Sequence, residues 1–335
     1  MICFIKVKFA LAAFAIVLGM LFACTKSGTQ NNDTGKDSVA STGSFIFQAD
    51  PTIFYDNGKY YLYGTDGYTP DKGIKVYVSS DKKEWKVPDG VSDGFALRAL
   101  ESFGTAGFWA PQVWKYNDRF YMAYVANEQI AIGVSSSPEG PFYAGSAIAF
   151  DQHNIDPFVF IDEDGKKYLY HVDISNGNKI YVAAINDDFT AIDKTTRTLC
   201  ITATETWETI QAKVTEGPAV LKHNGIYYLI YSANHYENQH YAVGYATAAS
   251  PMGPWTKAIE NPILSMTNTG KPGTGHGDIF FDADSTMNYV FHTHNSLSTV
   301  SPRRTALIKV GFVAGSGGTD KIVMDVSSLY YLKTK

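Results

Sequence analysis

One unit of sequence recurs five times along the chain, and this repetition restricts the possible folds more than any other feature. Each copy begins with a turn-like step, continues as an apolar strand and a polar turn, and ends in a strand rich in aromatic residues. The five openings are Asp50-Pro51, Ala110-Pro111, Asp156-Pro157, Glu216-Gly217-Pro218 and His276-Gly277. Their spacing of roughly 45 to 60 residues is typical of one supersecondary unit in a repeat protein.

Each interval between two openings has room for one four-stranded antiparallel sheet. Further strand candidates follow the first two in each copy, for example residues 74–79 and 306–312. Four-stranded sheets repeated radially are typical of β-propellers, so five copies predict an all-β chain with five blades around one channel. The alternatives fit poorly, since a parallel-sheet fold needs amphipathic helices between its strands and a β-sandwich lacks the long repeat.

The start of the chain is typical of an export signal. Lys6 and Lys8 precede an apolar run over residues 9–22, which is shorter than the ~20 residues of a membrane-spanning helix. Cys24 follows a small residue, as in a bacterial lipobox. Residues 1–23 are therefore predicted to be a lipoprotein signal peptide and Cys24 the lipidated residue; an ordinary cleaved signal with a chance cysteine is the alternative.

Residues 24–44 are polar and almost free of apolar side chains, which predicts a flexible tether before one catalytic domain over residues 45–335. The protein is thus predicted to be an exported bacterial lipoprotein of the periplasm, outer membrane or cell surface that touches a membrane only through its lipid. Cys200 is the one cysteine of the domain, so no intrachain disulfide is expected. A formal net charge of −5 argues against nucleic acid as a partner.

The repeat also predicts where polar side chains gather. The first strand of a propeller blade lies nearest the axis, so Asp50, Asp156, Glu216 and His276, at or near the starts of such strands, are expected to meet in one funnel. Crowded carboxylates raise each other's pKa, which costs stability unless a function retains them. Hydrolysis of a glycosidic bond with inversion is such a function, because it needs one protonated and one ionised carboxyl group with a water molecule between them.

These motifs resemble those of glycoside hydrolase family 43, the five-bladed propellers of arabinan and xylan breakdown, over residues 47–312. The matching segments are the Asp-Pro opening at Asp50, the Asp-Pro-Phe step at Asp156 and the Glu-Gly-Pro step at Glu216. The resemblance implies that Asp50 is the general base and Glu216 the general acid. It also implies that Asp156 orients Glu216 and keeps it protonated.

Two further segments resemble the substrate contacts of the family. The run from Phe108 to Pro111 is similar to an aromatic-Ala-Pro motif whose ring stacks on the sugar, so Phe108 and Trp109 are predicted to bind substrate; packing of Trp109 between blades is the alternative. Similar enzymes hold the sugar with an arginine just before the last repeat's strand. Of Arg303 and Arg304, Arg304 is predicted to take this role because of its distance to that strand.

His276 resembles the family histidine near the propeller axis. The resemblance implies that it contacts substrate and lies close to a calcium or other ion in the channel, while the reaction itself requires no cofactor. His292, His294 and Asn295 follow the fifth hairpin and are further candidates for the funnel wall.

The resemblance implies substrates that contain arabinose or xylose, either oligosaccharides or the side chains of plant-type polysaccharides. An exo-acting α-L-arabinofuranosidase is favoured. Only about 20 residues follow residue 312, so no appended sugar-binding domain is expected, which favours a short soluble oligosaccharide or a side chain over insoluble polymer as the target. A β-xylosidase, an endo-arabinanase and a β-galactofuranosidase of the same family stay open.

Alternatives outside this family have weaker support in the sequence. A single Asp-box-like turn at residues 80–85 suggests a sialidase-type propeller, but only one copy exists. The Asn-Asp-Pro-Asn opening expected of family 32 is absent. A non-catalytic, sugar-binding propeller lipoprotein would keep the fold without the reaction, and the retained acid and base candidates argue against it.

Overall fold

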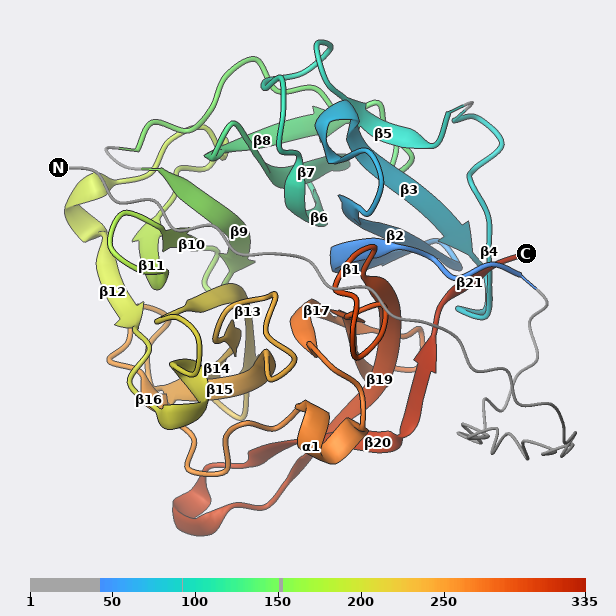
Figure 1. The fold of residues 1–335 in the computed structure, drawn as a ribbon. Helices are drawn as coiled ribbons and strands as arrows, with labels where there is room; N and C mark the ends of the chain where they lie inside the picture. Colours follow the sequence, from blue (N-terminus) through green and yellow to red (C-terminus); the bar gives the residue numbers. More distant parts are fainter. Residues whose placement is uncertain (1–42, 92, 151–152) are drawn as a thin grey trace, which may run out of the picture. The chain divides into compact units, whose positions relative to one another are not determined.

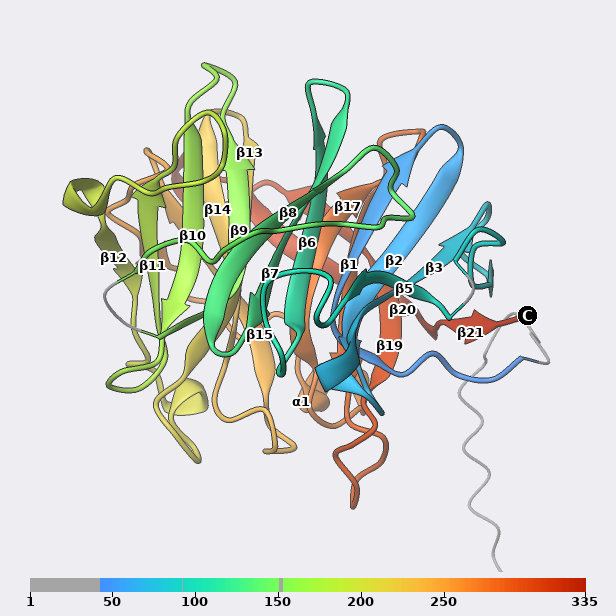
Figure 2. The same cartoon turned by 90° about the horizontal axis from the view of Figure 1, so that it is seen from above.

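The computed structural model describes residues 43–91, 93–150 and 153–335. They form five antiparallel sheets around a central channel, and the chain passes from one sheet to the next in sequence order (Figures 1 and 2). The predicted all-β, five-bladed propeller is therefore confirmed. The predicted signal peptide, the lipidation candidate Cys24 and residues 25–42 of the tether lie outside the described residues.

The strands of each blade follow one another from the channel outward. Blade 1 contains β1 (Gln48–Asp56), β2 (Lys59–Asp66), β3 (Gly73–Ser79) and β5 (Phe95–Arg98). Blade 2 contains β6 (Trp109–Tyr116), β7 (Arg119–Ala126) and β8 (Gln129–Ser135). Blade 3 contains β9 (Asn154–Ile161), β10 (Lys167–Asp173), β11 (Lys179–Ala184) and β12 (Thr198–Ile201). Blade 4 contains β13 (Thr215–His223), β14 (Ile226–Ala233), β15 (Ala242–Ala248) and β16 (Thr256–Lys257). Blade 5 contains β17 (Gly275–Phe281), β18 (Met287–Thr293), β19 (Arg304–Val313) and β20 (Lys321–Tyr331).

The first strands of the five blades form a closed ring. Strand β1 contacts β6 and β17, β9 contacts β6 and β13, and β13 contacts β17. Blade 2 is narrower than the others, because its fourth position holds only two bridges, Val134 with Tyr143 and Ala131 with Ala147. This ring places the starts of all five inner strands on one face.

Helical structure is sparse in the described residues. It consists of α1 (Met266–Thr269) and four 3-10 turns at Pro70–Lys72, Lys194–Thr196, Thr206–Glu208 and Ser316–Gly318. Within residues 43–335, apart from the three undescribed positions, no helix is both long and apolar enough to cross a membrane.

The aromatic end of each repeat unit supplies the core between blades. Each second strand carries a fully buried aromatic residue near its end, and Tyr63, Tyr124, Tyr170, Tyr231 and Phe291 are all 0% exposed. Buried tyrosines need a partner for the hydroxyl group, and two of these find one in a turn of the next blade. Tyr63 donates to the carbonyl of Pro138, and Tyr170 donates to that of Pro251. The repeated tyrosines therefore fix one blade against the next.

Both ends of the described chain close the ring between blades 5 and 1. The Ile46 N–H donates to the Leu332 carbonyl at 3.0 Å, and the Thr305 N–H donates to the Ile46 carbonyl at 3.0 Å. Beyond Leu332, β21 (Lys333–Thr334) pairs with β4 (Glu84–Trp85) of the first blade. The side chains of Ile46, Leu332 and Trp85 are at most 1% exposed and share one apolar cluster.

Replacing Ile46 by alanine is expected to destabilise the protein by about 2–5 kcal/mol, because it opens a cavity where the last blade meets the first. Urea denaturation followed by tryptophan fluorescence measures this change. The matched control is Ile259→Ala, since Ile259 is 95% exposed and its loss is expected to change stability by less than about 0.5 kcal/mol. Equal midpoints for the two variants would show that Ile46 does not hold the ring closed.

Candidate active site

A β-bulge interrupts every inner strand at its opening dipeptide. The pairing register shifts between Ala49 and Thr52 in β1, and the other four inner strands shift at the equivalent place. Asp50, Ala110 and Asp156 take the positive φ values of 49°, 45° and 52° there. A bulge turns a side chain out of the sheet and leaves a backbone position unpaired, which explains why proline is accepted next to it.

The backbone N–H groups freed by three of these bulges are bound by side chains of the preceding blade in the ring. The Asp50 N–H donates to Nδ1 of His292 at 3.1 Å, and the Ala110 N–H donates to Oγ1 of Thr65 at 3.0 Å. The Gly217 N–H donates to Oδ2 of Asp156 at 3.0 Å. The same bonds therefore join neighbouring blades and orient the polar side chains at the funnel.

A pocket of about 360 Å³ opens at this end of the channel. Its lining residues are Asp50, Trp109, Ile155, Asp156, Asn178, Val214, Glu216, His235, Tyr236, His276 and Arg303. They come from all five blades, as the repeat predicted, and they include the three carboxyl groups and the histidine of the predicted funnel.

Two side chains donate hydrogen bonds to the carboxylate of Asp50. Oδ2 accepts a hydrogen bond from Oγ1 of Thr65 at 2.7 Å, and Nη1 of Arg303 lies 3.1 Å from Oδ1. The ring of His276 approaches the same Oδ1 with Nδ1 at 3.7 Å. A carboxylate oxygen has further lone pairs, so Asp50 can still accept a proton from a bound water molecule.

Glu216 lies in a different environment, since its hydrogen-bond partners among the described residues are neutral. Oε1 accepts a hydrogen bond from the Tyr241 hydroxyl at 2.8 Å, and Oε2 accepts one from Nδ2 of Asn178 at 2.8 Å. Burial, followed by the charge of Asp156, raises the pKa of Glu216 to about 7. The adjacent Gly217 has a φ of 61°, and a Cβ there would lie 2.6 Å from the His276 ring, so only glycine fits beside this carboxyl group.

Asp156 and His276 both interact electrostatically with the other two carboxyl groups of the pocket. Asp156 is 7% exposed, and burial together with the charge of Asp50 raises its pKa to about 7. Nδ1 of His276 lies 3.5 Å from Oδ2 of Asp156, and burial lowers the pKa of His276, which favours the neutral ring. The pocket therefore holds three carboxyl groups with few cations, a setting in which at least one of them keeps its proton at neutral pH.

A metal ion has no prepared set of ligands in the described part of the chain. Residues 43–91, 93–150 and 153–335 contain no group of three or more His, Cys, Asp or Glu side chains placed to hold one. His276 instead faces Asp50 and Asp156 at 3.7 and 3.5 Å. The calcium implied by the resemblance stays a prediction, and no step below depends on it.

Two predicted substrate contacts, Phe108 and Arg304, are not among the residues that line the pocket. Phe108 is 0% exposed and stacks on the Tyr124 ring in the core, with ring centroids 6.0 Å apart. Its neighbour Trp109 lies at the bulge and lines the pocket. Successive strand residues point to opposite faces, so only one aromatic ring of this pair reaches the funnel.

The alternation of side chains along a strand also explains why Arg303, and not the neighbouring Arg304, lines the pocket. Arg304 bonds Oδ1 of Asn295 and lies over the Phe45 ring at 4.6 Å, outside the pocket. Arg303 is the residue that lines the pocket and contacts Asp50. Of the other candidates after the fifth hairpin, His292 accepts a hydrogen bond from the Asp50 N–H, and Nε2 of His294 donates one to the Tyr236 carbonyl at 2.7 Å.

Asn178 and Tyr241, the two donors to Glu216, were not predicted. Asn178 follows the turn between β10 and β11, and Tyr241 ends the turn between β14 and β15. These turns differ in length from blade to blade, so the repeat alignment does not place their residues. A polar residue in an Asn-Gly-Asn turn is the one signal that the sequence offers for Asn178.

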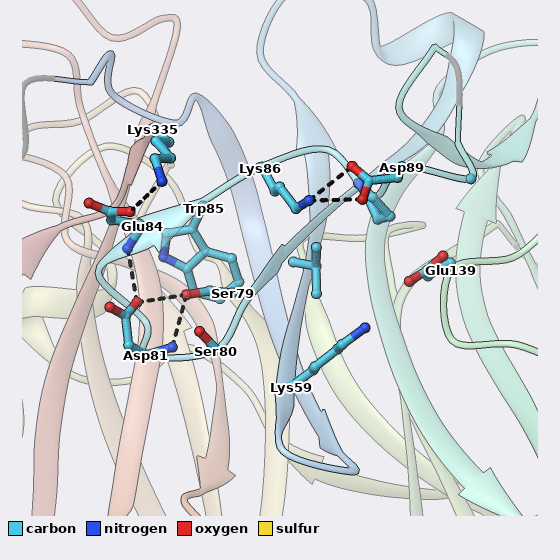
Figure 3. A pocket seen from close by; sticks show the side chains of 13 residues that line it. Lys59, Ser79, Ser80, Asp81, Glu84, Trp85, Lys86, Asp89, Glu139 and Lys335 are labelled. Atoms are coloured by element: carbon cyan, nitrogen blue, oxygen red, sulfur yellow. Dashed lines mark hydrogen bonds and ion pairs between the residues drawn. The ribbon is translucent and has the colours of Figure 1, made fainter.

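A second hollow, of about 430 Å³, lies near β4 and contains none of the predicted site residues (Figure 3). Its floor includes the Asp-box-like turn, where Asp81 accepts from the N–H groups of Lys83 and Glu84. Trp85 is 0% exposed and donates its indole N–H to the Lys82 carbonyl. This turn therefore has a structural explanation, and the hollow has no free aromatic face for a sugar.

Known proteins are similar to this chain in fold and in sequence. The family model of glycosyl hydrolases family 43 matches residues 45–315. A solved endo-1,4-beta-xylanase from Bacteroides thetaiotaomicron VPI-5482 is 42% identical, with a TM-score of 0.79, over 87% of this chain and 98% of that one. A xylosidase/arabinosidase 43A from Humicola insolens is 28% identical over 66% of this chain and 83% of its own length. A beta-D-galactofuranosidase from Aspergillus niger is 24% identical over 87% and 88%.

Asp156→Asn is expected to stabilise the protein at pH 8 by on the order of 2 kcal/mol and to change little at pH 4. The folded pKa of Asp156 is raised to about 7, so the folded wild type binds a proton that the unfolded chain releases near pH 4. Wild-type stability therefore falls as the pH rises between about 4 and 7, while the amide has no such loss and still accepts from Gly217. Urea denaturation at both pH values measures the difference.

The control for this variant is Asp188→Asn, the same chemical change at an exposed position. It is expected to leave stability within about 0.5 kcal/mol at both pH values. A loss of stability for Asp156→Asn at pH 8 would mean that the carboxylate form is favoured by the fold, contrary to the burial argument.

Proposed function

Since the chain belongs to glycosyl hydrolases family 43 and is a glycosidase, we propose that it hydrolyses its substrate with inversion, as an exo-acting α-L-arabinofuranosidase. The observation that carries the reaction is the pairing of Asp50 and Glu216 in one pocket with opposite surroundings. Asp50 is flanked by the Arg303 guanidinium, whereas Glu216 accepts from the neutral Tyr241 and Asn178 side chains and has a pKa raised to about 7. Two carboxyl groups in contrasting environments are the usual basis for dividing the acid and base roles.

In the proposed step, Glu216 donates its proton to the oxygen of the leaving sugar as the bond from that oxygen to the anomeric carbon breaks. Asp50 accepts a proton from a water molecule, whose oxygen forms the new bond to the anomeric carbon from the opposite side. Asp156 does not touch the reacting atoms in this scheme. Its carboxyl group binds the Gly217 N–H and raises the pKa of the neighbouring Glu216.

The size and walls of the pocket support exo action. A volume of about 360 Å³ lies near the lower end of the range for small-molecule sites, ~300–1,000 Å³, and suits one or two sugar rings. Trp109 offers an aromatic face for the C–H groups of a sugar, and Ile155 and Val214 continue that apolar wall. Arg303, Asn178 and His276 supply polar groups for hydroxyls.

A β-xyloside is the second candidate substrate. The specific observation in its favour is the similarity to the Bacteroides protein named as an endo-1,4-beta-xylanase, which at 42% identity exceeds that to the two fungal relatives. A linear xylan chain needs space beyond one pocket in both directions, whereas a pocket of about 360 Å³ favours a chain end or side branch.

Hydrolysis of 4-nitrophenyl α-L-arabinofuranoside is expected to exceed that of the β-D-xyloside and β-D-galactofuranoside. Asp50→Asn should lose about 10³-fold or more of kcat with every substrate. Glu216→Gln should lose much more activity on an arabino-oligosaccharide than on the nitrophenyl glycoside, because nitrophenolate leaves without protonation. Proton NMR of the first-formed sugar should show the anomer opposite to that of the substrate.

The exposed variant Asp188→Asn is the control and should keep wild-type rates. Retention of configuration, or full activity in folded Asp50→Asn, would refute the acid and base assignment. Faster release from the β-xyloside, or from internal bonds of xylan, would move the substrate to the second candidate. Binding of sugars without turnover of any of them would favour the non-catalytic alternative.

We also propose that the protein is exported and anchored through a lipid on Cys24, which rests on the sequence alone. The full chain produced in a bacterium is expected to enter the detergent phase of a Triton X-114 extract, and Cys24→Ser is expected to leave it. Detergent partitioning that survives Cys24→Ser would show that the cysteine is not the lipid site.

A further inference from the structure

Two fully buried rings lie directly behind the pocket, one beside the acid and one beside the base. Tyr241 and His292 are both 0% exposed, and neither belongs to the pocket lining. The Tyr241 hydroxyl donates to Oε1 of Glu216 at 2.8 Å, and Nδ1 of His292 accepts from the Asp50 N–H at 3.1 Å. The two rings stack with centroids 5.9 Å apart and planes 14° from parallel.

From this geometry we propose that Tyr241 and His292 form one positioning unit that sets the acid Glu216 and the base Asp50 relative to each other. The inference rests on the proposed function and adds two residues that act without touching the substrate. An inverting reaction depends on the separation of its two carboxyl groups, because a water molecule must fit between one of them and the sugar. A stacked pair of rings behind them is a rigid spacer for that separation.

The surroundings of Tyr241 leave it little freedom. A Cβ at Gly275 would lie 2.9 Å from Cε1 of Tyr241 and 2.7 Å from Oγ of Ser232, so the glycine allows β17 to pass against the ring. Thr274 donates its hydroxyl to the Tyr241 carbonyl at 3.3 Å. Burial and the charge of Glu216 raise the pKa of Tyr241 well above its usual value, so its hydroxyl remains a donor.

His292 is held as a neutral ring. Burial and the charge of Arg303 lower its pKa well below the usual value, with His276 and His294 acting in the same direction. A neutral imidazole has one acceptor nitrogen. Two donors face this ring: the Asp50 N–H at Nδ1, and Nη1 of Arg303 at 3.2 Å from Nε2. The position of the ring therefore depends both on the backbone of Asp50 and on the arginine that contacts the Asp50 carboxylate.

Four groups face Glu216 and govern its proton. Asp156 raises the pKa of Glu216, while the hydrogen bonds of Tyr241 and Asn178 and the nearby His276 lower it. Replacing Tyr241 by phenylalanine therefore keeps the ring and removes one hydrogen bond that lowers the pKa of Glu216. The pKa of Glu216 should rise, and activity should persist to higher pH.

The first test is the pH profile of kcat/KM for full-length wild type and Tyr241→Phe. The wild-type profile should fall as the pH rises through about 7, and that of Tyr241→Phe should fall at a higher pH. Its kcat at pH 6 should be lower by roughly 10- to 100-fold, with KM changed less than about threefold. An unmoved alkaline limb with wild-type kcat would overturn the proposal.

The matched control is Tyr231→Phe. Tyr231 is also fully buried in blade 4, and its hydroxyl also donates to a carboxylate, Oε1 of Glu208 at 2.7 Å, but it lies outside the pocket. It should lose stability without moving the pH profile. An equal shift of the alkaline limb in Tyr231→Phe would show that the effect is a general loss of packing, and would also overturn the proposal.

A double-mutant cycle tests whether the two rings act together. His292→Phe keeps the stack and removes both nitrogens, and it should lower kcat when made alone. In the variant that carries both changes, the loss of kcat should be at least threefold smaller than the product of the single losses. Losses that multiply would show that the rings act separately.

A titration without substrate separates this proposal from the proposed function. The ¹³C-labelled side-chain carboxyl signal of Glu216, assigned by its absence in Glu216→Gln, should titrate at a higher pH in Tyr241→Phe than in the wild type. A raised pKa in a protein that hydrolyses none of the glycosides would support the positioning role and refute the activity. An unchanged pKa would refute the positioning role even in an active enzyme.

Discussion

The structure depends on the hydrogen bonds made by the backbone groups that the β-bulges of the inner strands leave unpaired. A bulge turns its residue toward the channel and frees an N–H that must find a partner, because a buried donor without one costs about 1–3 kcal/mol. At Asp50, Ala110 and Gly217 the partner is a side chain of the adjacent blade: His292, Thr65 and Asp156. Fold and chemistry are therefore not separable at the funnel, since the groups that orient the carboxylates also join the blades.

Burial and local charge then give the carboxyl groups different surroundings. Asp156 and Glu216 meet few positive charges, and the pKa of each is raised to about 7, whereas Asp50 contacts Arg303 and the hydroxyl of Thr65. The arrangement reduces the stability of the folded chain at neutral pH, because it holds away from water groups that ionise freely in the unfolded chain. A glycosidase gains from this cost, since a general acid is useful only while it holds its proton.

The bulge positions also explain which parts of the site the sequence can predict. Asp50, Asp156 and His276 repeat with the blades, and Glu216 precedes the fourth bulge by one residue, so the alignment places all four. Phe108 and Arg304 lie next to the residues that line the pocket, Trp109 and Arg303, because the repeat gives the place of a strand start but not which of two alternating side chains faces the channel. Asn178 and Tyr241 come from turns of unequal length, whose position only three-dimensional packing determines. The fold was predicted more completely than the site, since blades repeat and connecting turns do not.

The closing contacts bring the two ends of the described domain together. The Thr334 N–H donates to the Ser44 carbonyl at 2.8 Å, so the chain enters and leaves the propeller at one point. Figure 1 shows the first blade and β21 side by side there. Such a topology tolerates circular permutation: a short linker can join the two ends, and new ends can be opened at the Asn57-Gly58 hairpin, at the opposite end of β1 from the funnel. The propeller can equally be placed as an insert within another protein, because both of its connections occupy a single site on its surface.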